Sequence, residues 1–225
     1  MSRWAAGLAA CAAVLAMVAL PPFAGAQEKA RKKGAAAAGS APATKAPEKV
    51  DYAQRFASVC ASCHGANGRS DMAGTPVLAG QPSLYAITQL FLFREGRRDN
   101  AAMTAVAKTL SDDDMRGFAD YIGTLPPVPA PAAATPADAA RMAKGRQLAE
   151  QHRCVSCHGA DLGGGQQVPR IGGQKEEYLL ASLRGFKSGS RPAYTQAMTA
   201  AVSQIPLEDL DTIAYFVARF PGPAR

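Results

Sequence analysis

The chain contains 225 residues, a length that fits one large domain or two small ones. Its formal net charge is +7, of which Arg3 carries +1, residues 27–50 carry +4, and residues 51–225 carry only +2. A charge this small on the larger part of the chain gives no basis for nucleic-acid binding there, and we expect no nucleic-acid partner.

Residues 1–26 predict a secretory signal peptide. Arg3 precedes an apolar run over residues 4–20, which is followed by two prolines and a small-residue site. The run is short for a membrane span and rich in alanine, so we prefer cleavage after Ala26 to a membrane anchor. Cys11 lies in a lipoprotein-like box, but the apolar core before it is too short, and we interpret the box as a coincidence. We expect an exported protein.

Residues 27–49 predict a disordered basic tail. This segment lacks aromatic residues and large apolar runs, so it cannot offset the entropy that it would lose on ordering. A flexible tether is one interpretation. A basic arm for an anionic membrane surface or an acidic partner is the other.

Helical patterns fill the first predicted domain, residues 50–126. The segment before Cys60 and the segment 83–94 have helical character, and Ser111 with three following aspartates predicts the start of another helix. That helix carries an apolar stripe at helical spacing, formed by Met115, Phe118, Ala119 and Ile122. No alternating strand pattern is present, so the sequence predicts an all-α fold.

A Pro/Ala-rich linker at residues 127–136 precedes a second predicted domain at residues 137–221. The second domain repeats the first at an offset of about 94 residues, with a helix predicted over 175–187. The paired positions include Gly80-Gln81 with Gly173-Gln174, Tyr85 with Tyr178, Phe93 with Phe186, Arg98 with Arg191, and Met103 with Met198. This agreement predicts an internal duplication.

Each repeat contains a CxxCH motif, with Cys60 and Cys63 before His64 and with Cys154 and Cys157 before His158. CxxCH is the attachment signature of c-type haem, in which two thiols add to the porphyrin and the histidine binds iron. One tetrahedral zinc site would use all four cysteines but leave the repeated histidines without a role. A redox dithiol would need a βαβ context that is missing from the sequence. We expect two covalently bound haems.

Counting restricts the second axial ligand of each haem. His64 and His158 serve as the first ligands, and the third histidine, His152, lies too close to His158 to reach the opposite face. Methionine is the alternative, because a thioether suits haem iron and raises its potential. Met103 and Met198 alone hold matched places in the two repeats, so we predict His64/Met103 and His158/Met198 ligation.

The order CASCHGANG, Pro76, Met103 and LSDDDMRGFADYI resembles one half of a two-haem cytochrome c4, and the second repeat matches it again. The resemblance implies two tandem class I cytochrome c domains related by a pseudo-twofold axis, in the periplasm. It also implies that the carbonyls of Pro76 and Pro169 accept a hydrogen bond from the haem-ligating histidines. The long basic tail and Arg170, opposite Val77, depart from the pattern.

Six-coordinate iron favours electron transfer over substrate chemistry, so we expect no enzyme activity. The resemblance implies redox partners, with a donor such as a quinol-oxidising cytochrome bc complex and an acceptor such as a terminal oxidase. The cytochrome subunit of a flavocytochrome sulfide dehydrogenase and a haem peroxidase remain alternatives. For Arg98 and Arg191 we prefer surface solvation to a contact with haem propionates, whereas Tyr85 and Tyr178 either donate to propionates or pack.

Overall fold

The computed structural model of the chain describes residues 50–130, 135–191 and 195–220. These ranges contain helices and no strand, apart from one isolated bridge between Gly165 and Val168. No helix within them is long and apolar enough to cross a membrane. The all-α prediction is confirmed. The predicted signal peptide and basic tail lie outside the described residues.

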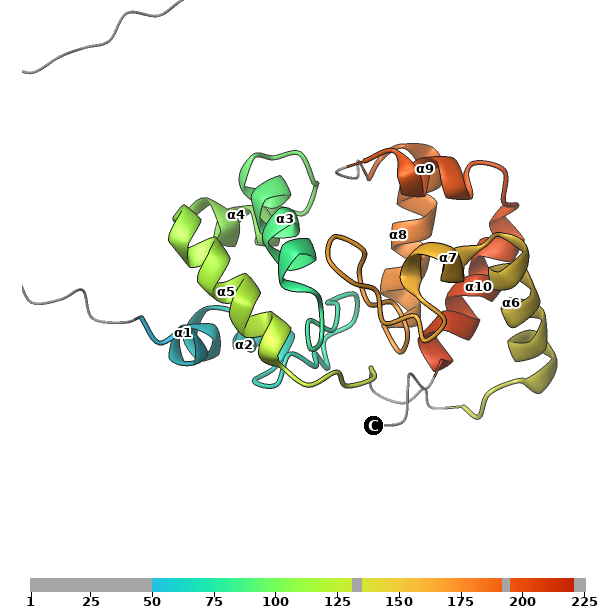
Figure 1. Cartoon of the computed structure of the whole chain (residues 1–225), viewed down its shortest axis with the longest axis horizontal. Helices are drawn as coiled ribbons and strands as arrows, with labels where there is room; N and C mark the ends of the chain where they lie inside the picture. Colours follow the sequence, from blue (N-terminus) through green and yellow to red (C-terminus); the bar gives the residue numbers. More distant parts are fainter. Residues whose placement is uncertain (1–49, 131–134, 192–194, 221–225) are drawn as a thin grey trace, which may run out of the picture. The chain divides into compact units, whose positions relative to one another are not determined.

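The described helices form two groups in the same order (Figure 1). The first group comprises α1 (Tyr52–Val59), α2 (Ala61–His64), α3 (Ser83–Arg94), α4 (Ala101–Lys108) and α5 (Asp112–Thr124). The second group comprises α6 (Ala139–Gln151), α7 (Cys154–His158), α8 (Glu176–Ser188), α9 (Ala197–Val202) and α10 (Leu207–Arg219). The repeated order agrees with the duplication predicted from the sequence.

Local signals explain where several helices begin. The Ser111 hydroxyl accepts a hydrogen bond from the Asp114 N–H, and the Asp114 carboxylate accepts one from the Ser111 N–H, which forms a capping box at α5. Helix α3 has the predicted bounds, and α8 lies one residue beyond its predicted range. The sequence patterns did not predict helices α4 and α9, because both helices are short and neither carries an apolar stripe.

Each half has its own hydrophobic core. In the first half, Phe56 of α1 and Met115 of α5 are buried against residues of α3, which confirms Met115 as a core residue. In the second half, Leu148 of α6 and Leu210 of α10 are fully buried in a separate cluster. Burial of these apolar side chains supplies the main stabilisation of each half.

A glycine allows the first and last helices of each half to pack closely. A Cβ at Gly117 of α5 would lie 2.0 Å from the Tyr52 ring of α1. A Cβ at Gly145 of α6 would lie 2.4 Å from the Phe216 Cβ of α10. The glycine is therefore on the last helix of the first half and on the first helix of the second half.

The two halves belong to one compact unit, Glu48–Arg225. The described part of the linker contributes to the contact between them. The Ala130 N–H donates to the Gly173 carbonyl over 2.7 Å, and the Arg170 guanidinium donates to the Val128 carbonyl over 3.2 Å. Gly80 of the first half faces Pro127, whose Cγ would lie 2.6 Å from a Cβ at Gly80. Residues 127–130 thus pack against both halves.

Candidate functional site

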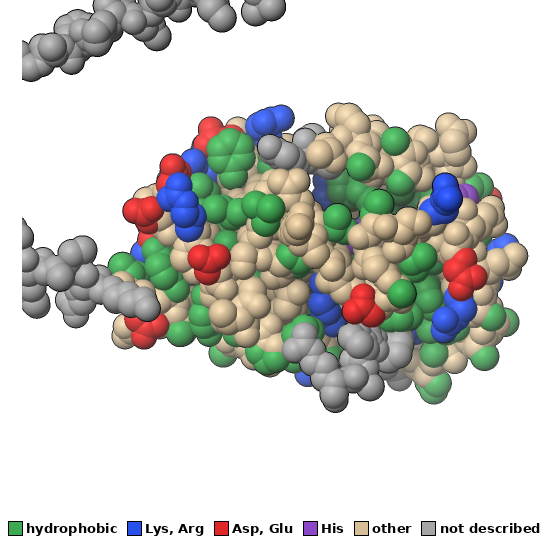
Figure 2. Space-filling view, viewed as in Figure 1, with side chains coloured by type: hydrophobic (Ala, Val, Ile, Leu, Met, Phe, Trp, Pro, Cys, Tyr) green, Lys and Arg blue, Asp and Glu red, His purple; other side chains and the backbone are tan. Residues whose placement is uncertain are grey.

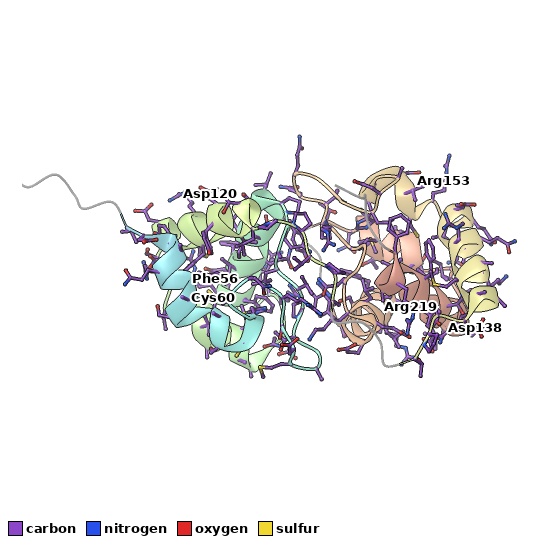
Figure 3. The ribbon with its side chains drawn as sticks, turned by 90° about the horizontal axis from the view of Figure 1, so that it is seen from below. Phe56, Cys60, Asp120, Asp138, Arg153 and Arg219 are labelled. Carbon is purple, nitrogen blue, oxygen red and sulfur yellow. The ribbon has the colours of Figure 1, made fainter. Side chains whose placement is uncertain are left out.

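The first CxxCH motif spans the junction of α1 and α2. Cys60 is the residue between these helices, one turn after the buried Phe56, and Figure 3 shows these two residues together in the first half. Helix α2 then carries Cys63 and His64, and the His64 N–H donates to the Cys60 carbonyl over 2.9 Å. One helical turn therefore holds both thiols and the histidine at fixed spacing. In the second half α7 carries the corresponding residues, Cys154, Cys157 and His158.

Both histidines are buried and bonded to a backbone carbonyl. The Nδ1 atom of His64 lies 3.1 Å from the Pro76 oxygen, and that of His158 lies 2.9 Å from the Pro169 oxygen. The two contacts implied by the resemblance are therefore present. Because a carbonyl only accepts, Nδ1 carries the proton and Nε2 keeps its lone pair for a metal.

The environment favours a neutral imidazole at both positions. Burial lowers the pKa of His64 and of His158, and it outweighs the opposing effect of the proline carbonyls. A neutral imidazole is the form that binds a metal ion.

The first thiol of each CxxCH motif is not activated. All four described cysteines are free, and burial raises the pKa of Cys60 to about 11 and also raises that of Cys154. A redox dithiol needs a lowered pKa, so this alternative is not supported. Nor do three His, Cys, Asp or Glu side chains converge anywhere in the described ranges, which argues against the zinc alternative.

The two predicted methionine ligands occupy matching helices. Met103 lies on α4, where its N–H donates to the Asn100 side chain over 2.9 Å, and Met198 lies on α9. Both side chains are partly buried, and Met198 packs against the core of the second half. The structure brings together the cysteines, the histidine and the proline of each half. Methionine ligation stays a prediction.

The preference for surface solvation of Arg98 and Arg191 was wrong. The two guanidinium groups converge on the Tyr178 hydroxyl, at 2.8 Å for Arg98 and 3.2 Å for Arg191. Burial raises the pKa of Tyr178, but these two cations outweigh it and lower the pKa. Arg98 comes from the first half, so this cluster joins the two halves.

Two glutamines had no role assigned from the sequence. Gln81 and Gln174 are buried, with 4% and 3% of their surfaces exposed, and each bonds to the backbone of the opposite half. The available signal was their matched place in the repeat, directly after a glycine.

The donor set of each half fits a covalently attached haem. It offers two free thiols one turn apart and a buried histidine whose Nδ1 is already bonded, so Cys60, Cys63 and His64 would hold one haem and Cys154, Cys157 and His158 the other. Bound haem would supply one-electron chemistry, and the chain would fix its ligands. On the face shown in Figure 2, acidic and basic side chains of the described residues are interspersed.

Comparison with known proteins supports this assignment. The family model for cytochrome c matches residues 50–126 and again residues 142–218. A thiosulfate dehydrogenase electron acceptor of Thiomonas intermedia is 35% identical over 71% of this chain and 82% of its own length. Cytochrome c4 of Pseudomonas aeruginosa is 29% identical over 73% of this chain and 85% of its own length.

Solved structures agree with these relatives. Reduced cytochrome c4 from Pseudomonas stutzeri superposes with a TM-score of 0.66 at 25% identity, covering 75% of this chain and 96% of that one. Thiosulfate dehydrogenase TsdBA from Marichromatium purpuratum gives the same TM-score at 32% identity, covering 76% of this chain and 40% of that one. Fold and motifs thus define a protein with two tandem haem-binding domains. The chain belongs to the cytochrome c family, as a two-domain member of the cytochrome c4 type with two covalently bound haem c groups.

Proposed function

We propose that this protein is a periplasmic electron carrier whose two haems are ligated by His64/Met103 and His158/Met198. The observation that carries the proposal is the identical anchoring of the two histidines, each buried and bonded through Nδ1 to a proline carbonyl. Such anchoring fixes the ring, so that Nε2 would be held in place to bind the iron of a haem. The predicted signal peptide at residues 1–26 supports export.

Methionine as the second ligand would leave both irons six-coordinate. Both ligands would then stay bound when an electron enters or leaves, and the thioether would raise the potential. Met103 and Met198 support this arrangement by their matched places on α4 and α9. A peroxidase would instead need one open iron position.

Replacement of each methionine tests the ligand assignment. We expect Met103→Ala and Met198→Ala each to remove one methionine–iron charge-transfer band from the oxidised spectrum and to lower one of the two potentials. The matched control is Met72→Ala, because the Met72 side chain is 51% exposed and has no counterpart in the second half. Persistence of both bands, or ready binding of carbon monoxide to reduced wild-type protein, would contradict the assignment.

For the electron donor, we propose a thiosulfate-oxidising enzyme. The supporting observation is that two relatives are described as thiosulfate dehydrogenase electron acceptors, with 35% and 38% identity. The second of these relatives, from Stutzerimonas stutzeri, is covered over 66% of its length. Relatives described as cytochrome c4 favour the second candidate, a carrier between a quinol-oxidising cytochrome bc complex and a terminal oxidase.

Rapid mixing separates the two donors. Oxidised protein is mixed with thiosulfate and a catalytic amount of thiosulfate dehydrogenase, and haem reduction is followed optically. We expect the enzyme to turn over repeatedly until both haems of all the cytochrome are reduced. No reduction should occur when the enzyme is left out. Faster reduction by a cytochrome bc complex with quinol would favour the second candidate, and a flavoprotein that copurifies in equal amounts would favour the flavocytochrome alternative.

A further inference from the structure

The strongest unassigned feature is a reciprocal pair of glutamines between the halves. Gln174 accepts a hydrogen bond from the Val77 N–H over 2.8 Å and donates to the Val77 carbonyl over 2.9 Å. Gln81 accepts from the Arg170 N–H over 3.1 Å and donates to the Arg170 carbonyl over 2.8 Å. Val77 and Arg170 are equivalent in the repeat, so each half clamps the same backbone position of the other.

The clamped position is chemically connected to the haem ligand. The Val77 N–H and the Pro76 carbonyl belong to one planar peptide group, whose resonance links its nitrogen to its oxygen. The oxygen of that group accepts from His64 and its N–H donates to Gln174. A hydrogen-bonded chain therefore runs from the His64 ring, through one peptide group, to a side chain of the second half.

The same connection runs in the opposite direction. The Pro169 carbonyl accepts from His158, and the N–H of the same peptide group, that of Arg170, donates to Gln81. Hydrogen bonds in such chains polarise one another. An acceptor on the peptide N–H makes the carbonyl oxygen more negative, which strengthens its bond to the histidine and makes Nε2 a stronger electron donor. A stronger donor stabilises oxidised iron.

We propose that Gln81 and Gln174 are positioning residues that set haem potentials across the domain boundary, so that Gln174 lowers the potential of the first-half haem and Gln81 that of the second-half haem. The inference rests on His64 and His158 as axial ligands, as in the proposed function. Its distinctive consequence is a crossed effect, in which a change in one half alters the haem of the other.

Redox titration of Gln174→Leu and Gln81→Leu holoprotein tests this inference, with the two potentials assigned by the methionine variants described above. We expect Gln174→Leu to raise the ratio of reduced to oxidised first-half haem about threefold at a fixed ambient potential. The change at the second-half haem should be smaller. Gln81→Leu should do the reverse, so each variant is the matched control of the other.

The possible outcomes distinguish failure of this inference from failure of the proposed function. Equal shifts at both haems, or a shift confined to the haem of the substituted half, would overturn it and indicate a purely structural role. If a leucine variant does not fold, Gln174→Ala and Gln81→Ala leave room for water at the clamped peptide and should give the same crossed pattern with a smaller size. If wild-type protein lacks methionine–iron bands, the proposed ligation fails, whereas unchanged potentials with intact bands refute only the glutamine relay.

Discussion

The loop that follows the haem-attachment motif is built alike in the two halves but carries different charges. In both, the histidine bonds to a proline carbonyl, and a glutamine from the other half bonds to the next residue. That next residue is the fully buried Val77 in the first half and Arg170 in the second. Farther along, Pro82 corresponds to Lys175. The hydrogen-bonding frame is thus shared, and the charged groups are not.

This difference gives the two histidines different surroundings. Lys175 is only 6% exposed, and its ammonium donates to the Met72 carbonyl, so a cation of the second half lies against the first half. Burial is the main cause of the lowered pKa of His64, and the charge of Lys175 lowers it further. For His158, burial alone opposes the Pro169 hydrogen bond. A common frame can therefore hold two haems in unlike electrostatic environments.

The largest difference between the halves should be seen at the helix-packing glycines. We expect Gly145→Ala to lower the free energy of unfolding by about 3 kcal/mol, because the new methyl group meets the Phe216 Cβ and also lies 2.8 Å from the Thr212 carbonyl oxygen. Gly117→Ala should cost about 1 kcal/mol, since the three atoms nearest to its methyl group all belong to the partly exposed ring of Tyr52, a side chain that can move where backbone cannot. Guanidinium unfolding followed by circular dichroism measures both.

Each glycine variant controls for the other, because both replace a helical glycine by alanine and gain the same helix propensity. Equal losses, or a larger loss for Gly117→Ala, would show that the two helix pairs accommodate a methyl group equally well. The packing difference between the halves would then have no energetic consequence.

Much of the fold and part of the site could be predicted from local patterns. The CxxCH motifs, the capping signal at Ser111 and the stripe containing Met115 each act within a few turns of chain. The contacts with Pro76 and Pro169 were implied by the family resemblance and are present. The duplication was visible because it repeats at one offset through both halves.

Contacts between the halves could not be predicted, because they depend on how distant segments meet. Gln81 lies 89 residues from its partner Arg170, and no periodicity links them. Arg98 was interpreted as a solvated side chain, yet it bonds to Tyr178 of the other half. Helix α4 was missed because a short alanine-rich segment gives little periodic signal.

A smaller effect should appear when the cation that distinguishes the halves is removed. We expect Lys175→Gln to lower the ratio of reduced to oxidised first-half haem about fivefold at a fixed ambient potential, because a nearby positive charge favours the less positive, reduced iron. The amide retains a hydrogen-bond donor on a side chain one bond shorter, while the charge is lost. Redox titration with assigned potentials measures the shift.

The matched control is Lys144→Gln, which makes the same substitution at an exposed position of α6, where solvent and salt screen the charge. It should leave both potentials unchanged. If Lys175→Gln moved the second-half haem more than the first, the charge of Lys175 would act mainly within its own half. The unlike surroundings of His64 and His158 would then need another source, and Arg170, buried where the first half has Val77, would be the next residue to replace.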